Sequence, residues 1–353
     1  MIVRTRRSDS TLKTDPVGRT PIMKPMNRLD RRDFLTCAGG WAAASLFGCG
    51  GRQPASDAPP QRFEFVPHVV GANTAIQGEG FFKAIDIVHG LGFRTLEILL
   101  VLGRLEATPG QHPGFRYDQL AEEQKEKIKA ALDPCDQITV HLPFSIPYMN
   151  PDDEDAVADL EMSIEASGFM GAKVAVLHPQ SGGTQLEETR PTVIERTRKW
   201  ASMAADLGFQ IACETSVPRS IPGLVEFVDE INHDNVGVTL DVGHQARFDE
   251  LSHVKPEDYG TPEGIKAYND VNVKIVEALG EKLFHLHVHD IEPGTWREHK
   301  PLVHGFIDYP RLLAKLREIR YPGVLIFEIG GEGEAMPAYL GDSKQKLDGY
   351  LAG

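Results

Sequence analysis

The sequence predicts a (β/α)8 TIM barrel over residues 61–353, preceded by a leader and tether over residues 1–60. Three observations support this fold class. From Phe63 onward, short apolar runs alternate with longer amphipathic stretches, the pattern of parallel strands joined by helices. Eight such runs follow one another with no linker between halves. No Gly-rich phosphate turn follows the first run, as the runner-up fold, an open doubly wound sheet, would normally require.

The predicted strands are apolar runs that are long enough for a buried strand and too short for a helix. We expect them at Phe63–Val70, Thr95–Leu100, Gln137–Leu142, Lys173–Leu177, Gln210–Cys213, Val236–Leu240, Leu283–Val288 and Val324–Phe327. Amphipathic spacing predicts helices at Phe81–Leu91, Tyr117–Leu132, Glu154–Phe169, Glu187–Leu207, Leu224–Ile231, Pro262–Leu279 and Tyr309–Ile319, with a further helix from Met336. Gly92 and Gly208 mark the ends of two of these helices.

The residues before the barrel have the features of an export leader. Arg31-Arg32-Asp33-Phe34-Leu35 precedes the mildly apolar segment Cys37–Phe47 and resembles the leader of the twin-arginine export pathway, although Asp30 and Thr36 depart from its usual flanking residues. The apolar segment is too short to span a bilayer as a helix. The pattern therefore predicts twin-arginine export to the periplasm. The alternative is a chance arginine pair in an amphipathic or disordered N-terminus.

A second motif follows the apolar segment. Leu46-Phe47-Gly48-Cys49 resembles a lipobox, so Cys49 is a candidate lipid anchor of an exported lipoprotein. Residues 50–60 have the Gly, Pro, Ser and Asp content of a flexible tether. The first residue of the protein is Met1, Met23 or Met26. The later two are alternatives because the residues before them contribute no feature of an export leader.

The barrel region is strongly acidic. The first 49 residues hold nine of the 37 Lys and Arg and four of the 51 Asp and Glu, which leaves 28 basic and 47 acidic residues and a net charge of about −19 for the remainder. Such a surface repels phosphate backbones, so we expect no nucleic acid partner. The two cysteines of this region, Cys135 and Cys213, lie too far apart for a metal-binding motif, and Cys213 is expected in the core.

Six consecutive predicted strands end on residues that can bind a metal ion or transfer a proton. These residues are His141, His178, Glu214, Asp241 with His244, the group His285, His287, His289 and Asp290, and Glu328. Each residue alone is more commonly structural, but in a closed barrel the carboxyl ends of all strands meet at one mouth, where active sites are built. The period of two along the seventh strand places its three histidines on one face, so only one or two of them can reach the centre.

The mixed set of imidazoles and carboxylates suits a divalent ion such as Mn²⁺, Mg²⁺, Co²⁺ or Zn²⁺. Such an ion would stabilise the charge of an oxyanion or enediolate on a bound substrate. Glu214 and Glu328, on nearly opposite strands, could then flank the substrate as base and acid.

Six segments at these strand ends resemble those of a known superfamily. They are 138–144 (ITVHLPF), 176–179 (VLHP), 212–215 (ACET), 240–244 (LDVGH), 287–290 (HVHD) and 327–328 (FE). From about Phe63 to the C-terminus, the chain resembles the xylose-isomerase-like barrel superfamily. That group contains sugar isomerases and epimerases, inosose dehydratases and isomerases, and metallophosphodiesterases of the AP-endonuclease type.

The resemblance implies roles for individual residues. The single-metal site of the superfamily would be formed by Glu214, Asp241, His287 and Glu328, and Glu214 and Glu328 would double as acid and base on either side of the carbon that loses its proton. His244 would contact substrate oxygens. His141 and His178 match positions that bind additional zinc in the nuclease branch and more often line the pocket in the sugar branch.

The segment from Arg297 to Asp308 resembles the loop D-x-H-x-P-x-G-x-G-x-I-D that follows strand seven in the superfamily. Arg297 replaces the first Asp of this loop, which argues against a three-zinc nuclease site. Arg297 is either a ligand for a substrate hydroxyl or carboxylate or a surface residue, and His299 stays a candidate ligand beside the substrate.

The leading hypothesis is a metal-dependent isomerase or epimerase of a sugar or keto-polyol. Glu214 or Glu328 would remove a proton between two oxygens, giving an enediolate. The same enolisation would serve a lyase or dehydratase acting on a 3-keto sugar. Two other classes stay open, an endonuclease-type metallohydrolase with two or three metal ions and a non-catalytic sugar-binding barrel. The expected partner is a small carbohydrate, and association into homo-oligomers is left open.

Overall fold

The computed structural model describes residues 69–107, 110–181, 183, 185–330 and 334–352, all within the unit Arg62–Gly353. Several sequence predictions lie outside the described residues. They are the leader with Arg31 and Arg32, the lipobox with Cys49, the tether, and the first residues of the first predicted strand.

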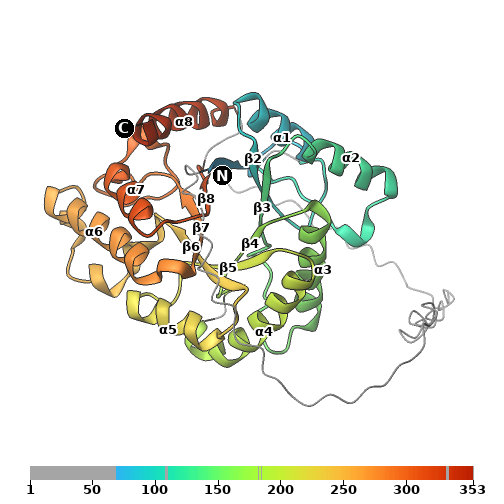
Figure 1. The fold of residues 1–353 in the computed structure, drawn as a ribbon, viewed down its shortest axis with the longest axis horizontal. Helices are drawn as coiled ribbons and strands as arrows, with labels where there is room; N and C mark the ends of the chain where they lie inside the picture. Colours follow the sequence, from blue (N-terminus) through green and yellow to red (C-terminus); the bar gives the residue numbers. More distant parts are fainter. Residues whose placement is uncertain (1–68, 108–109, 182, 184, 331–333, 353) are drawn as a thin grey trace, which may run out of the picture. The chain divides into compact units, whose positions relative to one another are not determined.

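Eight parallel strands close into a barrel in which each strand pairs with the next and the last pairs with the first (Figure 1). The strands are β1 (Val69–Asn73), β2 (Thr95–Leu99), β3 (Gln137–His141), β4 (Val174–Leu177), β5 (Gln210–Glu214), β6 (Val236–Asp241), β7 (Leu283–Val288) and β8 (Val324–Phe327). The predicted (β/α)8 fold is confirmed, and the doubly wound sheet is excluded because the sheet is closed.

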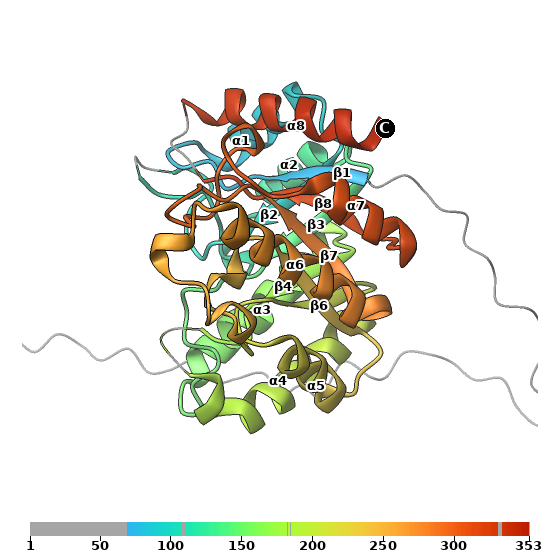
Figure 2. The same ribbon diagram turned by 90° about the vertical axis from the view of Figure 1, so that its left-hand side faces the viewer.

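The helices form an outer layer around the strands, as Figure 1 and the side view in Figure 2 show. They are α1 (Phe81–Gly90), α2 (Glu122–Leu132), α3 (Glu154–Met170), α4 (Leu186–Asp206), α5 (Ile221–Ile231), α6 (Pro262–Leu279), α7 (Tyr309–Glu318) and α8 (Met336–Ala352). Within the described part of the chain, none of these helices combines the length and apolar character needed to cross a membrane.

Side-chain caps fix where several helices begin. Asp153 accepts a hydrogen bond from the Ala156 amide before α3, and Ser220 accepts one from Gly223 before α5. Thr261 and Asp308 do the same for α6 and α7. A cap of this kind satisfies one of the free amides of the first turn, so each helix starts at a defined distance from the strand before it.

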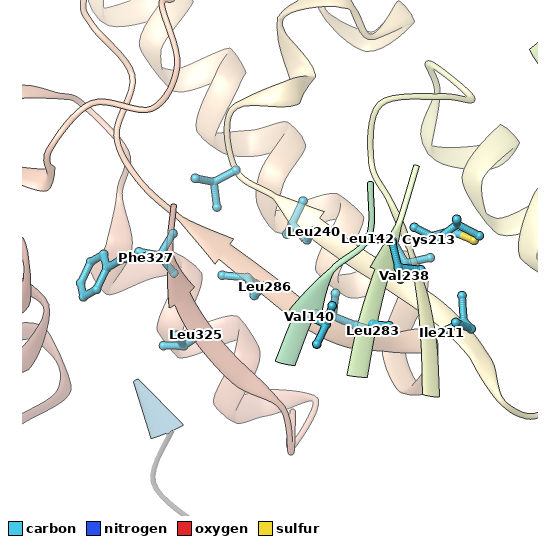
Figure 3. Close-up of a cluster of buried hydrophobic side chains, with 14 of the residues drawn as sticks. Val140, Leu142, Ile211, Cys213, Val238, Leu240, Leu283, Leu286, Leu325 and Phe327 are labelled. Carbon is cyan, nitrogen blue, oxygen red and sulfur yellow. The ribbon is translucent and has the colours of Figure 1, made fainter. Parts of the chain in front are cut away.

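Alternation along the strands separates the core from the site. Successive residues of a strand point to opposite faces, so the apolar residues at every second position share one face. Figure 3 shows buried apolar side chains from β3, β5, β6, β7 and β8, among them Val140, Cys213, Val238 and Phe327. The residues between them, which include Thr139, Glu214, Thr239 and Asp241, therefore face the interior of the barrel, and they are also buried.

Two predicted elements differ from the structure. The first strand runs to Asn73 instead of ending at Val70. The helix predicted over Tyr117–Leu132 is wrong in its first part, because η1 (Tyr117–Gln119) is a separate short 3-10 helix and α2 begins only at Glu122. Leu120 and Ala121 have extended backbones, which end the short helix η1. The Ala121 amide then donates a hydrogen bond to the Gln124 side chain at the start of α2.

Candidate active site and metal centre

The four residues predicted as metal ligands meet at the mouth of the barrel. Glu214 ends β5, Asp241 ends β6, His287 lies on β7 and Glu328 follows β8, and one ligand atom from each lies within 4.8 Å of those of the other three. His287 is central to this cluster. Its Nδ1 is 2.8 Å from Glu328 Oε2, 3.0 Å from Glu214 Oε1 and 3.6 Å from Asp241 Oδ2.

The cluster fits a divalent cation. Glu214 Oε2, Asp241 Oδ2 and Glu328 Oε2 are buried and accept no hydrogen bond of good geometry from the described residues, although histidine nitrogens lie near all three. Buried carboxylate oxygens without donors are costly unless an ion binds them. Ligand atoms about 2.1 Å from one ion lie roughly 3–4 Å apart, which is compatible with the observed spacing. Three carboxylates and one imidazole form the hard donor set that Mn²⁺, Mg²⁺, Co²⁺ or Zn²⁺ accepts.

The carboxylates of this cluster are held in the ionised form. Burial raises the pKa of Glu214, but His178 and His141 outweigh burial and bring that pKa well below its usual value. For Asp241, burial is likewise outweighed by His244 and His289, and its pKa also lies well below the usual value. Burial raises and His287 lowers the pKa of Glu328, with a net decrease. The site therefore holds three ionised carboxylates, which are suited to bind a cation.

Glu97, a site residue that the sequence analysis missed, supports the ligand set from β2. The side chain is fully buried, and His287 Nε2 lies 3.1 Å from Glu97 Oε1 and 3.3 Å from Oε2. Asn73 and Thr139 donate to the two oxygens of the same carboxylate at 2.8 and 3.2 Å. A carboxylate that accepts the Nε2–H of a histidine leaves Nδ1 free to bind metal, the usual second contact of a metal-binding imidazole.

The electrostatics of Glu97 agree with this arrangement. Burial raises its pKa, but His287 and the neighbouring His285 outweigh burial and hold that pKa at about 2. The signal for Glu97 was present in the sequence, because it is the only charged residue in the predicted strand Thr95–Leu100. The pattern of polar residues at strand ends does not include Glu97, because Glu97 lies two residues before the end of β2.

His141 and His178 form a second group with Glu214. His178 Nε2 contacts Glu214 Oε2, His141 Nε2 lies 3.6 Å from the same oxygen, and the two imidazole nitrogens are 3.3 Å apart. Burial lowers the pKa of His141, but Glu214 and other carboxylates outweigh burial and raise that pKa to about 9. His178 also lines a cavity at the mouth, whereas His141 is buried.

A third group consists of Asp241, His244 and His299, each of which offers a ligand atom within 4.8 Å of the others. Burial lowers the pKa of His244, and Asp241 outweighs that effect and raises it to about 9. His299 Nδ1 is 2.9 Å from the Glu328 carbonyl oxygen. The predicted residues His244 and His299 therefore lie beside the four-residue cluster.

The three histidines of the seventh strand region have different environments. His287 reaches the centre of the cluster. This agrees with the prediction that only one or two of the three histidines can do so. His289 is fully buried, and its Nε2 is 2.9 Å from Asp241 Oδ1. His285 Nε2 lies 3.2 Å from Glu97 Oε2, but neither ring nitrogen makes a hydrogen bond of good geometry with the described residues. Burial lowers the pKa of His285 to about 4.

A cavity of about 560 Å³ adjoins the cluster through His178 and His244. Arg297, predicted as a substrate ligand or a surface residue, lines this cavity and is exposed. Nearby, the ring of Phe144 is 45% exposed and stacks on His178 with 5.3 Å between the ring centres. The mouth therefore offers an open, mainly polar space with an aromatic surface at its edge, next to the candidate metal ligands.

Comparisons with known proteins agree with this fold. The family described as xylose isomerase-like TIM barrel matches residues 85–348. A relative, an uncharacterized protein of Methanocaldococcus jannaschii, is 27% identical over 232 residues, which are 61% of this chain and 70% of that protein. Solved structures with similar folds include the following two.

The first is a D-tagatose 3-epimerase-like protein, with a TM-score of 0.57, 21% identity, and coverage of 80% of this chain and 97% of that chain. The second is the 3-keto-D-glucoside 4-epimerase of E. coli, with a TM-score of 0.54, 18% identity, and coverage of 80% and 99%. At these identities the two structures establish a likeness of fold alone. The family match spans most of the chain, which therefore belongs to the xylose isomerase-like TIM barrel family.

Proposed function

We propose that this protein is a metal-dependent isomerase or epimerase that acts on a sugar or keto-polyol. The observation that carries the proposal is the cluster of Glu214, Asp241, His287 and Glu328 beside an open polar cavity. Three buried carboxylate oxygens of this cluster accept no hydrogen bond of good geometry from the described residues. Two similar folds, named as a D-tagatose 3-epimerase-like protein and a 3-keto-D-glucoside 4-epimerase, support the sugar class.

The two glutamates of the cluster are the proposed acid and base. A divalent ion, when bound, would stabilise negative charge on the substrate oxygens. Glu328 has a side chain that is 20% exposed towards solvent, whereas that of Glu214 is 1% exposed. One carboxylate takes the C–H proton next to the substrate carbonyl, and the electron pair moves onto the carbonyl oxygen to give an enediolate. Return of a proton to the other face or the neighbouring carbon gives the epimer or the isomer.

Other side chains at the mouth are placed to hold the substrate. His178 and His244 lie between the cluster and the cavity, so they can donate hydrogen bonds to sugar hydroxyls. The exposed ring of Phe144 provides an apolar surface for the C–H face of a sugar. His141 lies deeper, where its role would be to position Glu214.

The test is proton exchange in D₂O. Metal-loaded protein is incubated with ketoses and with 3-keto sugars, and incorporation of deuterium at carbon is followed by NMR and mass spectrometry. We expect exchange in at least one class and its loss in the Glu214→Gln and Glu328→Gln variants, with full activity in a Glu226→Gln control on the exposed side of α5. Loss of a hydroxyl group from the product would assign the lyase variant of the same enolisation. Absence of exchange with bound metal confirmed would overturn the proposal.

A second candidate function is a multinuclear metallohydrolase. It is favoured by three further groups that adjoin the first cluster, namely His141–His178–Glu214, Asp241–His244–His299 and Glu97–His285–His287. The replacement of an expected Asp by Arg297 and the acidic composition of the barrel oppose it. Elemental analysis separates the two candidates, because one ion per chain is expected for the isomerase and two or three for the hydrolase.

We also propose that the chain is exported by the twin-arginine route and acylated at Cys49, as its N-terminal motifs predict. Cell fractionation of the protein with Arg31→Lys and Arg32→Lys together is expected to show retention in the cytoplasm. The Cys49→Ser variant is expected to be exported and to be released from the membrane fraction. Unchanged fractionation of both variants would contradict this part of the proposal.

A further inference from the structure

Three arginines line the cavity beside the candidate metal centre. Arg219 lies in the loop between β5 and α5, Arg247 ends η2 (His244–Arg247), and Arg297 lies in the loop after β7. In the part of the chain that the structure describes, none of the three side chains makes an ion pair or a hydrogen bond. The charge of Arg297 acts on the nearby Glu292, but the two side chains form no ion pair among the described residues, and Glu292 accepts a hydrogen bond from Thr295.

Most other described arginines have partners. Examples are Arg116 with Asp159, Arg190 with Glu230, and Arg311 with Asp270. Residues 50–353 contain 28 basic and 47 acidic residues, so acceptors for a guanidinium are abundant. Three guanidinium groups that are unpaired among the described residues and line one cavity, in a protein with excess negative charge, are therefore a specific feature of this cavity.

The loops that carry these arginines are fixed by contacts with one another and with the core. The Asp249 amide donates to the Arg219 carbonyl oxygen at 2.8 Å, which ties the loop after β5 to the segment after η2. Next to Arg297, the buried Trp296 stacks on Tyr259 with 3.8 Å between the ring centres, and its Nε1 donates to the Tyr259 carbonyl oxygen at 3.0 Å. The backbones that bear the arginines are thus positioned before any ligand arrives.

The composition of the cavity matches an anionic oxygen group. A guanidinium presents planar donors in a fork that fits a carboxylate or phosphate, and such charge-assisted bonds are the strong ones. Neutral sugar hydroxyls do not require three positive charges. Gln180 and Ser216, which also line the cavity, can bind hydroxyl groups. Glu298 also lines the cavity, and its charge acts on His244, on the side towards the metal ligands.

We propose that the substrate is an anionic sugar whose carboxylate or phosphate group binds to Arg219, Arg247 and Arg297 while the reacting carbon lies next to Glu214 and Glu328. This inference rests on the proposed function and narrows its substrate class from sugars in general to sugar acids or sugar phosphates. One cavity can hold both the anionic group and the reacting carbon of such a ligand. It is lined by the three arginines and by His178 and His244, and these two histidines also contact Glu214.

The test compares matched ligands on metal-loaded protein by isothermal titration calorimetry. The probes are glucuronate, glucose 6-phosphate and neutral glucose, followed by the corresponding ketose pairs with and without the charged group. We expect at least about tenfold tighter binding of one anionic probe than of the neutral probe, decreasing with added salt. Whichever anionic probe binds more tightly, glucuronate or glucose 6-phosphate, identifies the anionic group of the substrate as a carboxylate or a phosphate.

Variants assign the effect to the three arginines. Arg219→Gln, Arg247→Gln and Arg297→Gln are each expected to weaken the anionic probe about tenfold and leave the neutral probe within about twofold. Arg320→Gln is the matched control, because Arg320 is also exposed and unpaired among the described residues but lies between α7 and β8, at the opposite end of the barrel. Equal binding of charged and neutral probes, or unchanged anion binding in all three variants, would overturn the inference.

The outcomes separate this inference from the proposed function. Deuterium exchange on neutral ketoses without preference for anions would leave the isomerase in place and remove the anionic substrate class. Anion binding that depends on the arginines, without exchange on any probe, would keep the binding site and remove the isomerase.

Discussion

At the scale of single residues, the contact between Glu97 and His287 decides which nitrogen faces the ligand cluster. Glu97 is ionised and accepts from Nε2, so Nδ1 points to Glu214 and Glu328 with its lone pair available once its proton leaves. The carboxylate is itself held by Asn73 and Thr139, which restricts the imidazole to one orientation. Metal affinity should therefore depend on a residue that does not touch the ion.

The Glu97→Gln variant tests this dependence. Its amide can donate to Nε2, which favours the tautomer with hydrogen on Nδ1 and blocks the ligand position. We expect a decrease in metal affinity of about 10–100-fold, measured by competition with a metal-sensitive chelator. The Glu226→Gln variant serves as the control, and circular dichroism checks that both variants are folded. Wild-type affinity in a folded Glu97→Gln protein would show that the contact is not needed.

Asp290 is a buried acid that predicts a pH dependence of stability. Its Oδ1 accepts hydrogen bonds from the amides of Ile291 and Ile307 at 2.8 and 2.9 Å, and burial raises its pKa to about 7. An aspartate in the unfolded chain ionises near pH 4. The folded state therefore binds the proton more tightly, and the stability that this adds is complete below about pH 4 and is lost as the pH rises through about 7.

The Asp290→Asn variant keeps an acceptor oxygen and cannot ionise. Between pH 5 and pH 8, we expect the wild type to lose about 2–3 kcal/mol of unfolding free energy relative to this variant. Urea unfolding of both proteins at the two pH values measures the difference, and the other titrating groups cancel because both proteins share them. Parallel pH curves would contradict the prediction.

At the scale of elements, the pairing of β6 with β7 depends on a glycine. A Cβ at Gly237 would lie 2.4 Å from the Phe284 ring and 2.6 Å from the Lys282 carbonyl oxygen, and the pairing shifts register just beyond it, between Val238 and Thr239. Because the carbonyl belongs to the backbone, it cannot move without disturbing β7, which carries His287.

We therefore expect Gly237→Ala to destabilise the protein by about 1–3 kcal/mol, measured by chemical denaturation. Gly349 in α8 is the matched control, since a Cβ there would meet nothing within 4 Å. Alanine at that helical position should stabilise by about 0.5–1 kcal/mol. Equal effects of the two substitutions would show that the close approach at Gly237 is not a constraint.

The same elements show how far the sequence predicts the site. Strand ends could be found because an apolar run that stops on a polar residue is a local pattern, and this pattern located Glu214, Asp241 and Glu328. Glu97 lies within its strand, so its contact with His287 could not be predicted without the closed barrel, in which side chains of β2 and β7 meet in the interior. The break of the predicted helix at Leu120 and Ala121 has no proline or glycine to mark it. The three arginines that line the cavity, Arg219, Arg247 and Arg297, come from separate segments of the chain. The relative placement of these segments depends on tertiary contacts, so the sequence does not predict it.

At the scale of the whole molecule, the protein concentrates buried negative charge at one end of the barrel. Glu97, Glu214 and Asp241 are fully or almost fully buried, and Glu328 completes the set at the mouth. Neighbouring histidines compensate part of this charge by holding protons, as the raised pKa of His141, to about 9, indicates. A bound cation would compensate it directly, so occupancy of the site should stabilise the entire barrel.

Removal of the metal is therefore expected to lower the thermal midpoint. An ion present at about 1,000 times its dissociation constant contributes about 4 kcal/mol to the folded state, which corresponds to roughly 8–16 °C for a domain of this size class. Differential scanning calorimetry of the metal-loaded protein, of the protein with EDTA, and after re-addition of Mn²⁺ measures the effect. In the Asp241→Asn variant the three curves should coincide much more closely, because a ligand is lost. Identical midpoints for the loaded and chelated wild type would mean that the four side chains converge for a reason other than binding an ion.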